Sequence, residues 1–269
     1  MKSTHDQIED IKKNGYSLDF ATVFNHAFEN YKKIALYSGL IILVFSIIAF
    51  IAVVGILIAY FGAESISKNF FEEFENQDFT SVELLIQTVI VAVVAGIGAP
   101  FGAGFLKMAD CADKDMEFNV STIFSYYKSP YFGQIFLLTF LTTIVGSGIA
   151  NLIEVSLNSS GGNIIAVAIP YMISYWTYLS IPLIVFGKLN AIDALKSSFI
   201  VVSKNPLNIF AFFIVGLIGS VIGLFACCIG ILFTVVFNSS MTYATYFGIF
   251  GVQNEEEDTI DSIGKYNVD

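Results

Sequence analysis

The chain has little of what metal sites and nucleic-acid-binding surfaces require. It contains two histidines, His5 and His26, and neither lies in an apolar segment. Iron and zinc sites need several histidine, cysteine or carboxylate ligands, so we expect no metal site, no cofactor and no catalytic residue. Arginine is absent and the net charge is −10. Because nucleic acid is bound by basic faces, it is not an expected partner.

Cysteine is also scarce. Cys111 stands alone and Cys227 and Cys228 are adjacent, a pattern that fits neither a disulfide framework nor a zinc site. The adjacent pair is interpreted as small apolar filler in a tight membrane turn, with a redox role as the alternative. Between Asp110 and Asp113 one thiol stands among carboxylates, and there we expect a solvated cytoplasmic loop.

Charged residues are few as well. They make up 13% of the chain, and 55% of the residues are hydrophobic. The longest uncharged run, Leu207 to Phe250, is roughly twice as long as a helix needs to cross a ~30 Å hydrocarbon core, so a break near Ala226 to Gly230 divides it. Met1 to Tyr16 is polar, and we expect no signal peptide. These features predict an all-α, polytopic membrane protein.

The apolar segments predict six transmembrane helices. Their approximate ranges are 34–61, 82–108, 131–155, 164–186, 207–225 and 229–250. They belong to a membrane domain, residues 16–252, between a cytoplasmic tail, residues 1–15, and an acidic cytoplasmic tail, residues 253–269. With six spans, every lysine except Lys68 falls on the side of the termini. By the positive-inside rule, this predicts a multi-pass protein of a bacterial cytoplasmic (inner) membrane with both termini cytoplasmic.

A short internal repeat accompanies the spans. The sequence ATVF at residues 21–24 nearly recurs as STIF at 121–124, and each is followed by tyrosine, lysine and a span. This predicts three copies of an interfacial helix followed by a helical hairpin. The interfacial helices are expected at Tyr16 to Lys33, Phe118 to Tyr127 and Leu189 to Asn205. The alternative is that any helix leading into a span tends to be amphipathic, with lysine and tyrosine at the interface.

Polar side chains inside the predicted spans are rare. Glu83 and Glu154 lie at the outer ends of spans, and no ionisable side chain is placed near the midplane. Ion-coupled transporters usually carry such a charge. The deepest polar cluster is Asn238 with Ser239 and Ser240. Interhelical hydrogen bonding is the preferred interpretation of this cluster, and a substrate site is the alternative.

The second span has an unusual centre at residues 96–104, where four glycines surround Pro100. Proline removes a backbone donor, so a kink or a broken helix is expected there. Broken helices line the binding sites of many transporters. Gly98, Pro100 and Gly102, together with Asn238, are therefore the candidate functional positions in the membrane.

Pairs of glycines four residues apart predict close helix packing. Gly98 and Gly102 form one pair, and Gly219 and Gly223 form another. Each pair lies on one helix face and lets a neighbouring helix approach closely. For Gly98 and Gly102, a closely packed kink is the preferred interpretation, and a functional break is the alternative.

The last third of the chain carries a family resemblance. Its residues are ALKSS at 194–198, KNP at 204–206, Gly230 in a hairpin turn, and Tyr243 and Tyr246 late in the last span. These resemble a broad group of bacterial six-helix membrane proteins of unknown function, including the membrane domain of some glycerophosphodiester phosphodiesterases. The resemblance implies a non-catalytic membrane domain, because the chemistry of those phosphodiesterases belongs to a separate soluble domain.

Chains similar to this one often carry the name β-carotene 15,15′-monooxygenase. That name implies an iron enzyme with four histidine ligands, and this chain has two histidines in total. We therefore expect a structural, lipid-associated or partner-binding membrane module, with membrane lipids and other membrane proteins as partners. The alternatives are a small transporter that uses a broken second span, and a membrane enzyme acting on a lipid or isoprenoid.

Overall fold

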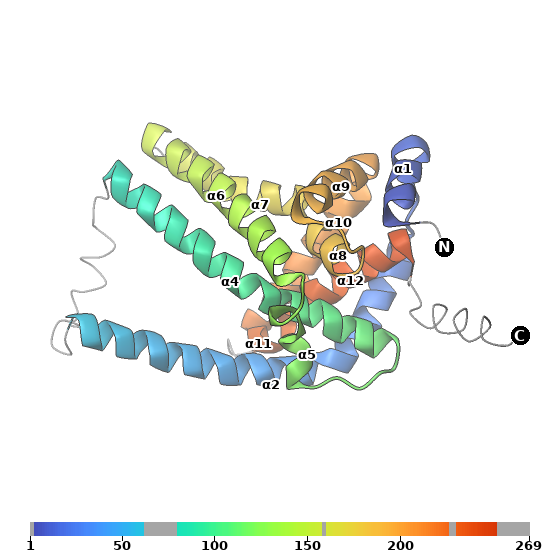
Figure 1. The fold of residues 1–269 in the computed structure, drawn as a ribbon, viewed down its shortest axis with the longest axis horizontal. Helices are drawn as coiled ribbons and strands as arrows, with labels where there is room; N and C mark the ends of the chain where they lie inside the picture. Colours follow the sequence, from blue (N-terminus) through green and yellow to red (C-terminus); the bar gives the residue numbers. More distant parts are fainter. Residues whose placement is uncertain (1–2, 62–79, 158–159, 226–229, 252–269) are drawn as a thin grey trace, which may run out of the picture.

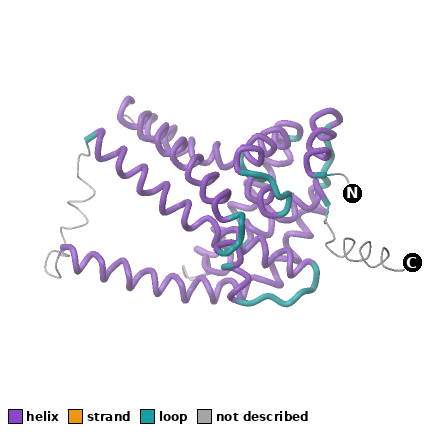
Figure 2. Tube along the Cα trace, viewed as in Figure 1, coloured by secondary structure: helices purple, strands orange, loops and turns teal. Residues whose placement is uncertain are grey.

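The protein is all-helical throughout the part described by the computed structural model, residues 3–61, 80–157, 160–225 and 230–251 (Figures 1 and 2). Five helical stretches are long and apolar enough to cross a membrane, which confirms a helical, multi-pass architecture. These stretches are Phe20–Ala59, Val82–Asp113, Phe132–Leu157, Gly162–Val185 and Pro206–Phe225. The predicted tail 253–269, the adjacent cysteines Cys227 and Cys228, and Lys68 lie outside the described residues.

The N-terminal segment, predicted as a solvated tail, forms α1 (Thr4–Asn14). Ser3 and Asp6 cap this helix reciprocally, and such a capping box satisfies backbone donors at the helix start. Ile8 and Ile11 are buried, and α1 packs on α9 (Ala191–Lys204). The sequence signal for this helix is weak, because only Ile8 and Ile11, three residues apart, are apolar in a short, charged segment.

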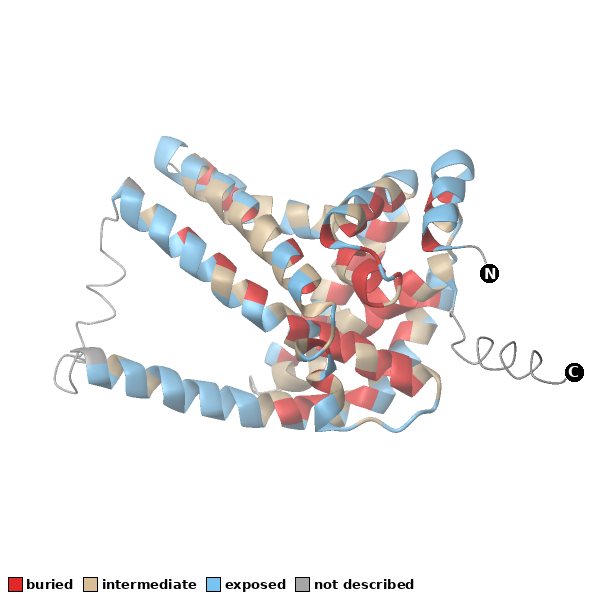
Figure 3. Cartoon of the chain, in the orientation of Figure 1, coloured by how far each residue is buried: buried red, intermediate tan, exposed pale blue. Residues whose placement is uncertain are grey.

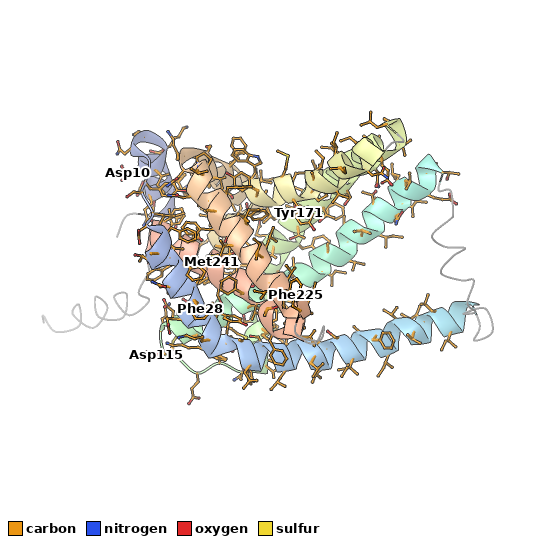
Figure 4. The ribbon with its side chains drawn as sticks, turned by 180° about the vertical axis from the view of Figure 1, so that it is seen from behind. Asp10, Phe28, Asp115, Tyr171, Phe225 and Met241 are labelled. Atoms are coloured by element: carbon orange, nitrogen blue, oxygen red, sulfur yellow. The ribbon has the colours of Figure 1, made fainter. Side chains whose placement is uncertain are left out.

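The longest helix, α2 (Phe20–Phe61), has 42 residues and spans about 63 Å. It joins the predicted first interfacial helix and the first span without interruption, since no glycine or proline separates them. At its start, Asp19 accepts hydrogen bonds from the Thr22 hydroxyl and amide, which hold the pKa of Asp19 below its usual value. Figure 4 shows Phe28 on the part of α2 beside the other helices, while the rest of α2 extends away.

Three helices follow in the middle of the chain: α4 (Ser81–Asp113), α6 (Phe132–Leu157) and α7 (Ser160–Trp176). Helix α6 packs against both α4 and α7 (Figure 1). Between α4 and α6, the expected second interfacial helix is reduced to α5 (Val120–Ile123) and the 3-10 turn η1 (Ser125–Tyr127). A short helix, α8 (Ser180–Val185), continues from α7 into the buried centre.

The C-terminal part consists of α9, α10 (Pro206–Val221), the 3-10 turn η2 (Ile222–Phe225), α11 (Gly230–Thr234) and α12 (Phe237–Phe250). A helix, α9, is thus observed where the third interfacial helix was predicted. The predicted sixth span is divided into α11 and α12, and the chain turns between them at Val235 and Val236. Six continuous spans and a regular threefold repeat therefore remain predictions.

The close packing predicted at Gly219 of α10 and Gly223 of η2 is observed. A Cβ atom on Gly219 would clash with the ring of Phe237, and one on Gly223 would clash with the backbone of Gly230. Helices α10 and α12 consequently pack closely together. Helix α11 between them reaches α2 at Gly39, against which the ring of Phe233 lies.

Burial is concentrated at one end of the molecule, where the first half of α2, the last half of α4 and α8 to α12 meet (Figure 3). Phe212, Met108 and Met241 are among the largest fully buried side chains there. Beyond Leu43, α2 is mostly exposed. The far ends of α2, α4 and α6 diverge from this packed body (Figure 3).

Candidate functional site

A buried polar network joins three helices at the end of α4. Asp110, only 4% exposed, pairs with Lys107 at 3.0 Å and with Lys114 at 3.1 Å. These residues are three and four positions apart, so the helix itself aligns them on one face. Asp113, one turn later, pairs with His26 of α2 at 2.6 Å. The network therefore ties the first half of α2 to the last turns of α4.

Tyr243 of α12 completes the network. Its hydroxyl oxygen lies 3.3 Å from Asp110 Oδ1 and 3.1 Å from Asp113 Oδ2. A phenol carries one hydrogen, so at any moment it donates to one of the two carboxylates. The ring is held by the edges of Phe186 and His26. Tyr243 is thus fixed by packing while its hydrogen bond is shared between two acceptors.

The network corrects the prediction of a solvated loop between Asp110 and Asp113. Helix α4 continues to Asp113, and Asp110, Cys111 and Ala112 are all buried. The available signal was the spacing of Lys107, Asp110 and Lys114, which suits ion pairs along one helix face. In the described part of the chain, no three histidine, cysteine, aspartate or glutamate side chains are grouped closely enough to hold a metal ion.

The proposed break in the second span is not observed. Helix α4 runs uninterrupted through Pro100. Gly98 and Gly102 are exposed, and a Cβ atom at either would meet nothing within 4 Å. The close approaches in this helix occur instead at Gly96, where a Cβ atom would clash with the ring of Phe136, and at Gly104, where it would clash with the backbone of Ile123. Within the described residues, Gly98 and Gly102 therefore neither line a break nor contact a neighbouring helix.

The remaining predicted positions, Asn238, Glu83 and Glu154, take no part in the polar network at the end of α4. Asn238 packs against α10, where its Oδ1 atom lies close to Gly216. Glu83 is exposed and caps the start of α4 by accepting hydrogen bonds from the amide and hydroxyl of Thr80. Glu154 is exposed near the end of α6.

An apolar groove of about 400 Å³ lies between the outer parts of α4 and α6. Its walls are almost purely aliphatic, with one polar pair, in which Asn151 Nδ2 donates to Thr88 Oγ1 at 2.9 Å. The lining residues are Leu84, Leu85, Thr88, Val89, Ile144, Gly148, Asn151, Leu152 and Val155. Sequence reasoning missed this groove, because it depends on how far two helices diverge rather than on any motif.

Several buried polar atoms have no hydrogen-bond partner among the described residues. Both polar atoms of the Asn30 side chain are in this state, and Asn30 is only 2% exposed. The Oδ1 atom of Asn238 and the hydroxyls of Ser240 and Ser180 are in the same state. Helix α12 carries two of these side chains and packs against α2 and α8, which carry Asn30 and Ser180.

Comparisons with protein-family models, with curated proteins and with solved structures found no match to this chain.

Proposed function

We propose that the protein is a non-catalytic, lipid-associated module of a bacterial inner membrane, with both termini cytoplasmic. The groove between α4 and α6 is the observation that carries this proposal. Its volume of about 400 Å³ falls within the range of about 300–1,000 Å³ that is typical of ligand pockets. Its rim residues Leu85, Leu152 and Val155 are all at least 60% exposed, so the groove faces the lipid side of the helices.

The chemistry of the groove suits the hydrocarbon chain of a lipid. Aliphatic walls gain free energy from covering apolar groups, at about 25 cal/mol per Å² buried. Thr88 accepts a hydrogen bond from Asn151 Nδ2 and donates to the Leu84 carbonyl at 2.8 Å. The Thr88 hydroxyl therefore makes no demand on an occupant, and apart from Asn151 the rest of the lining offers only apolar groups to a hydrocarbon chain.

Filling the groove tests the proposal. Gly148 lines it and has open space where a Cβ atom would stand. We expect Gly148→Leu to reduce the lipid retained by the purified protein severalfold, as measured by native mass spectrometry from mild detergent. Gly98→Leu is the matched control, because Gly98 also has open space but lies on α4 outside the groove. Equal lipid retention in both variants and the parent protein would refute the proposal.

A small transporter is the second candidate, favoured by the unpaired polar atoms around α12. Leaving a buried polar group unpaired costs about 1–3 kcal/mol, and buried water commonly satisfies such groups. Water reaching Asn30 and Ser240 would give α12 the hydrated path that transport requires. The uninterrupted α4 removes the broken span on which the transporter hypothesis first rested.

Cysteine accessibility distinguishes the two candidates. A water path predicts that Ser240→Cys reacts with a soluble maleimide in native membranes at least tenfold faster than Met241→Cys. Both positions are 0% exposed, so the comparison reports internal water rather than surface exposure. Labelling is located by peptide mass spectrometry, which separates it from the native cysteines. Equal, slow labelling at the two positions would exclude the transporter.

A further inference from the structure

One face of α9 is exposed although it carries large apolar side chains. Ile192, Lys196, Phe199 and Ser203 recur at intervals of three and four and form a single stripe, here called the α9 stripe. Ile192 is 43% exposed and Phe199 is 53% exposed. The opposite face is buried and consists of Ala191, Ala194, Ser197, Ser198, Val201 and Val202. Packing inside the protein therefore accounts for one face of α9 and leaves the other available.

Trp176 places the α9 stripe at the edge of the membrane. It is the single tryptophan of the chain and the last residue of α7. The hydroxyl of its neighbour Tyr175 donates to the carbonyl of Pro206, where the apolar helix α10 begins, so Trp176 lies level with the start of that helix. Tryptophan is enriched at membrane–water interfaces because its ring is apolar and its N–H is polar. The ring centroids of Trp176 and Phe199 are 4.7 Å apart, so Phe199 lies at the same depth as Trp176.

The charge of the α9 stripe is positive. Lys196 is exposed, and within the described residues it has no ion-pair partner. Asp193 accepts a hydrogen bond from Asn190 Nδ2 at 2.7 Å and so helps cap the helix start. Lys188 and Lys204 are exposed at the two ends of the helix. Lys196 lies between the apolar side chains Ile192 and Phe199. This arrangement complements an anionic lipid, because the lysine can pair with the negatively charged headgroup while the apolar side chains contact the acyl chain below it.

We propose that the α9 stripe binds anionic phospholipids of the bilayer, with Lys196 contacting the headgroup phosphate region and Ile192 and Phe199 entering the acyl boundary. This inference rests on the proposed lipid association and names its lipid class. It concerns a surface separate from the groove of α4 and α6. One lysine near an anionic membrane surface corresponds to about a fivefold preference for anionic over zwitterionic lipid.

The single tryptophan makes the test direct. The full chain is placed in phosphatidylcholine nanodiscs that contain a small fraction of either brominated phosphatidylglycerol or brominated phosphatidylcholine. Bromine quenches tryptophan fluorescence at short range, so quenching reports the lipid next to Trp176. We expect phosphatidylglycerol to reach half-maximal quenching at about one fifth of the mole fraction that phosphatidylcholine needs.

Two variants separate a local site from general charge attraction. Lys196→Gln should remove most of the preference, whereas Lys128→Gln, another exposed lysine, should keep it. Equal quenching by both lipids, no quenching by either, or an unchanged preference in Lys196→Gln would each overturn the inference. Lipid retention in the groove, measured by mass spectrometry on the same Lys196→Gln protein, should not change. A failure of this inference is therefore distinguishable from a failure of the proposed function.

Discussion

Replacing Asp110 by asparagine should lower the free energy of unfolding by about 2–3 kcal/mol. The Asp110 carboxylate is buried and balances two lysines, and asparagine keeps its shape while removing its charge. Breaking a fully buried ion pair costs about 3–5 kcal/mol. We expect less here because Lys107 and Lys114 are 31% and 24% exposed and partly solvated. Unfolding by sodium dodecyl sulfate in mixed micelles measures the change.

Asp115 provides the control for this experiment. Its carboxylate pairs with Lys33 at 2.6 Å, but its side chain is 85% exposed. Exposed ion pairs contribute about 0–1 kcal/mol, so Asp115→Asn should change stability little. If Asp110→Asn and Asp115→Asn lower the free energy of unfolding equally, the network at the end of α4 does not stabilise the packing of α2 against α4.

Replacing Gly104 by alanine should destabilise the protein by about 2 kcal/mol or more, because overpacking a well-packed contact typically costs about 1–3 kcal/mol. The added methyl group would clash with the backbone of Ile123, which cannot rotate away as a side chain can. The displaced segment is α5, so the junction between α4 and the following loop should loosen. Thermal unfolding in mild detergent detects the loss.

Gly102, two residues earlier in the same helix, should behave in the opposite way. It has open space at the Cβ position, and alanine favours a helix over glycine by about 1 kcal/mol. Gly102→Ala is therefore expected to be neutral or slightly stabilising, and Gly98→Ala likewise. If Gly102→Ala destabilised the protein as much as Gly104→Ala, a neighbour would have to pack closely on Gly102. The open space expected at Gly102 would then be wrong.

The architecture was predictable where composition alone decides it. Long uncharged runs must be helices in a bilayer, since the backbone has no water to pair with. The amphipathic α9 was also expected, because its polar and apolar faces alternate with helical spacing. Helix boundaries were less predictable. No glycine or proline stands at Lys33 or Ile34 to stop a helix. The predicted first interfacial helix and the predicted first span therefore form the single helix α2.

The candidate sites were harder to foresee because they depend on which helices meet. Tyr243 is far in sequence from Asp110 and Asp113, and only the packing of α4 against α12 brings the tyrosine to the two carboxylates. The glycine-rich centre of α4 suggested a break, yet a helix can pass through a proline when the rest of its backbone remains paired. The glycines of α4 with close neighbours are Gly96 and Gly104, and the positions of Phe136 and Ile123 decide this.

Helix α11 touches α2 at Gly39, and this contact has a mechanical consequence. From there to Phe61, α2 continues for about 33 Å, close to the thickness of a hydrocarbon core of ~30 Å. Phe45 still packs on Phe101 and Phe124, and beyond it most of the helix is exposed within the described residues. With few packed neighbours on that part, we expect its tilt to depend on hydrophobic matching to the surrounding bilayer. Its angle to the packed body should therefore change with membrane thickness.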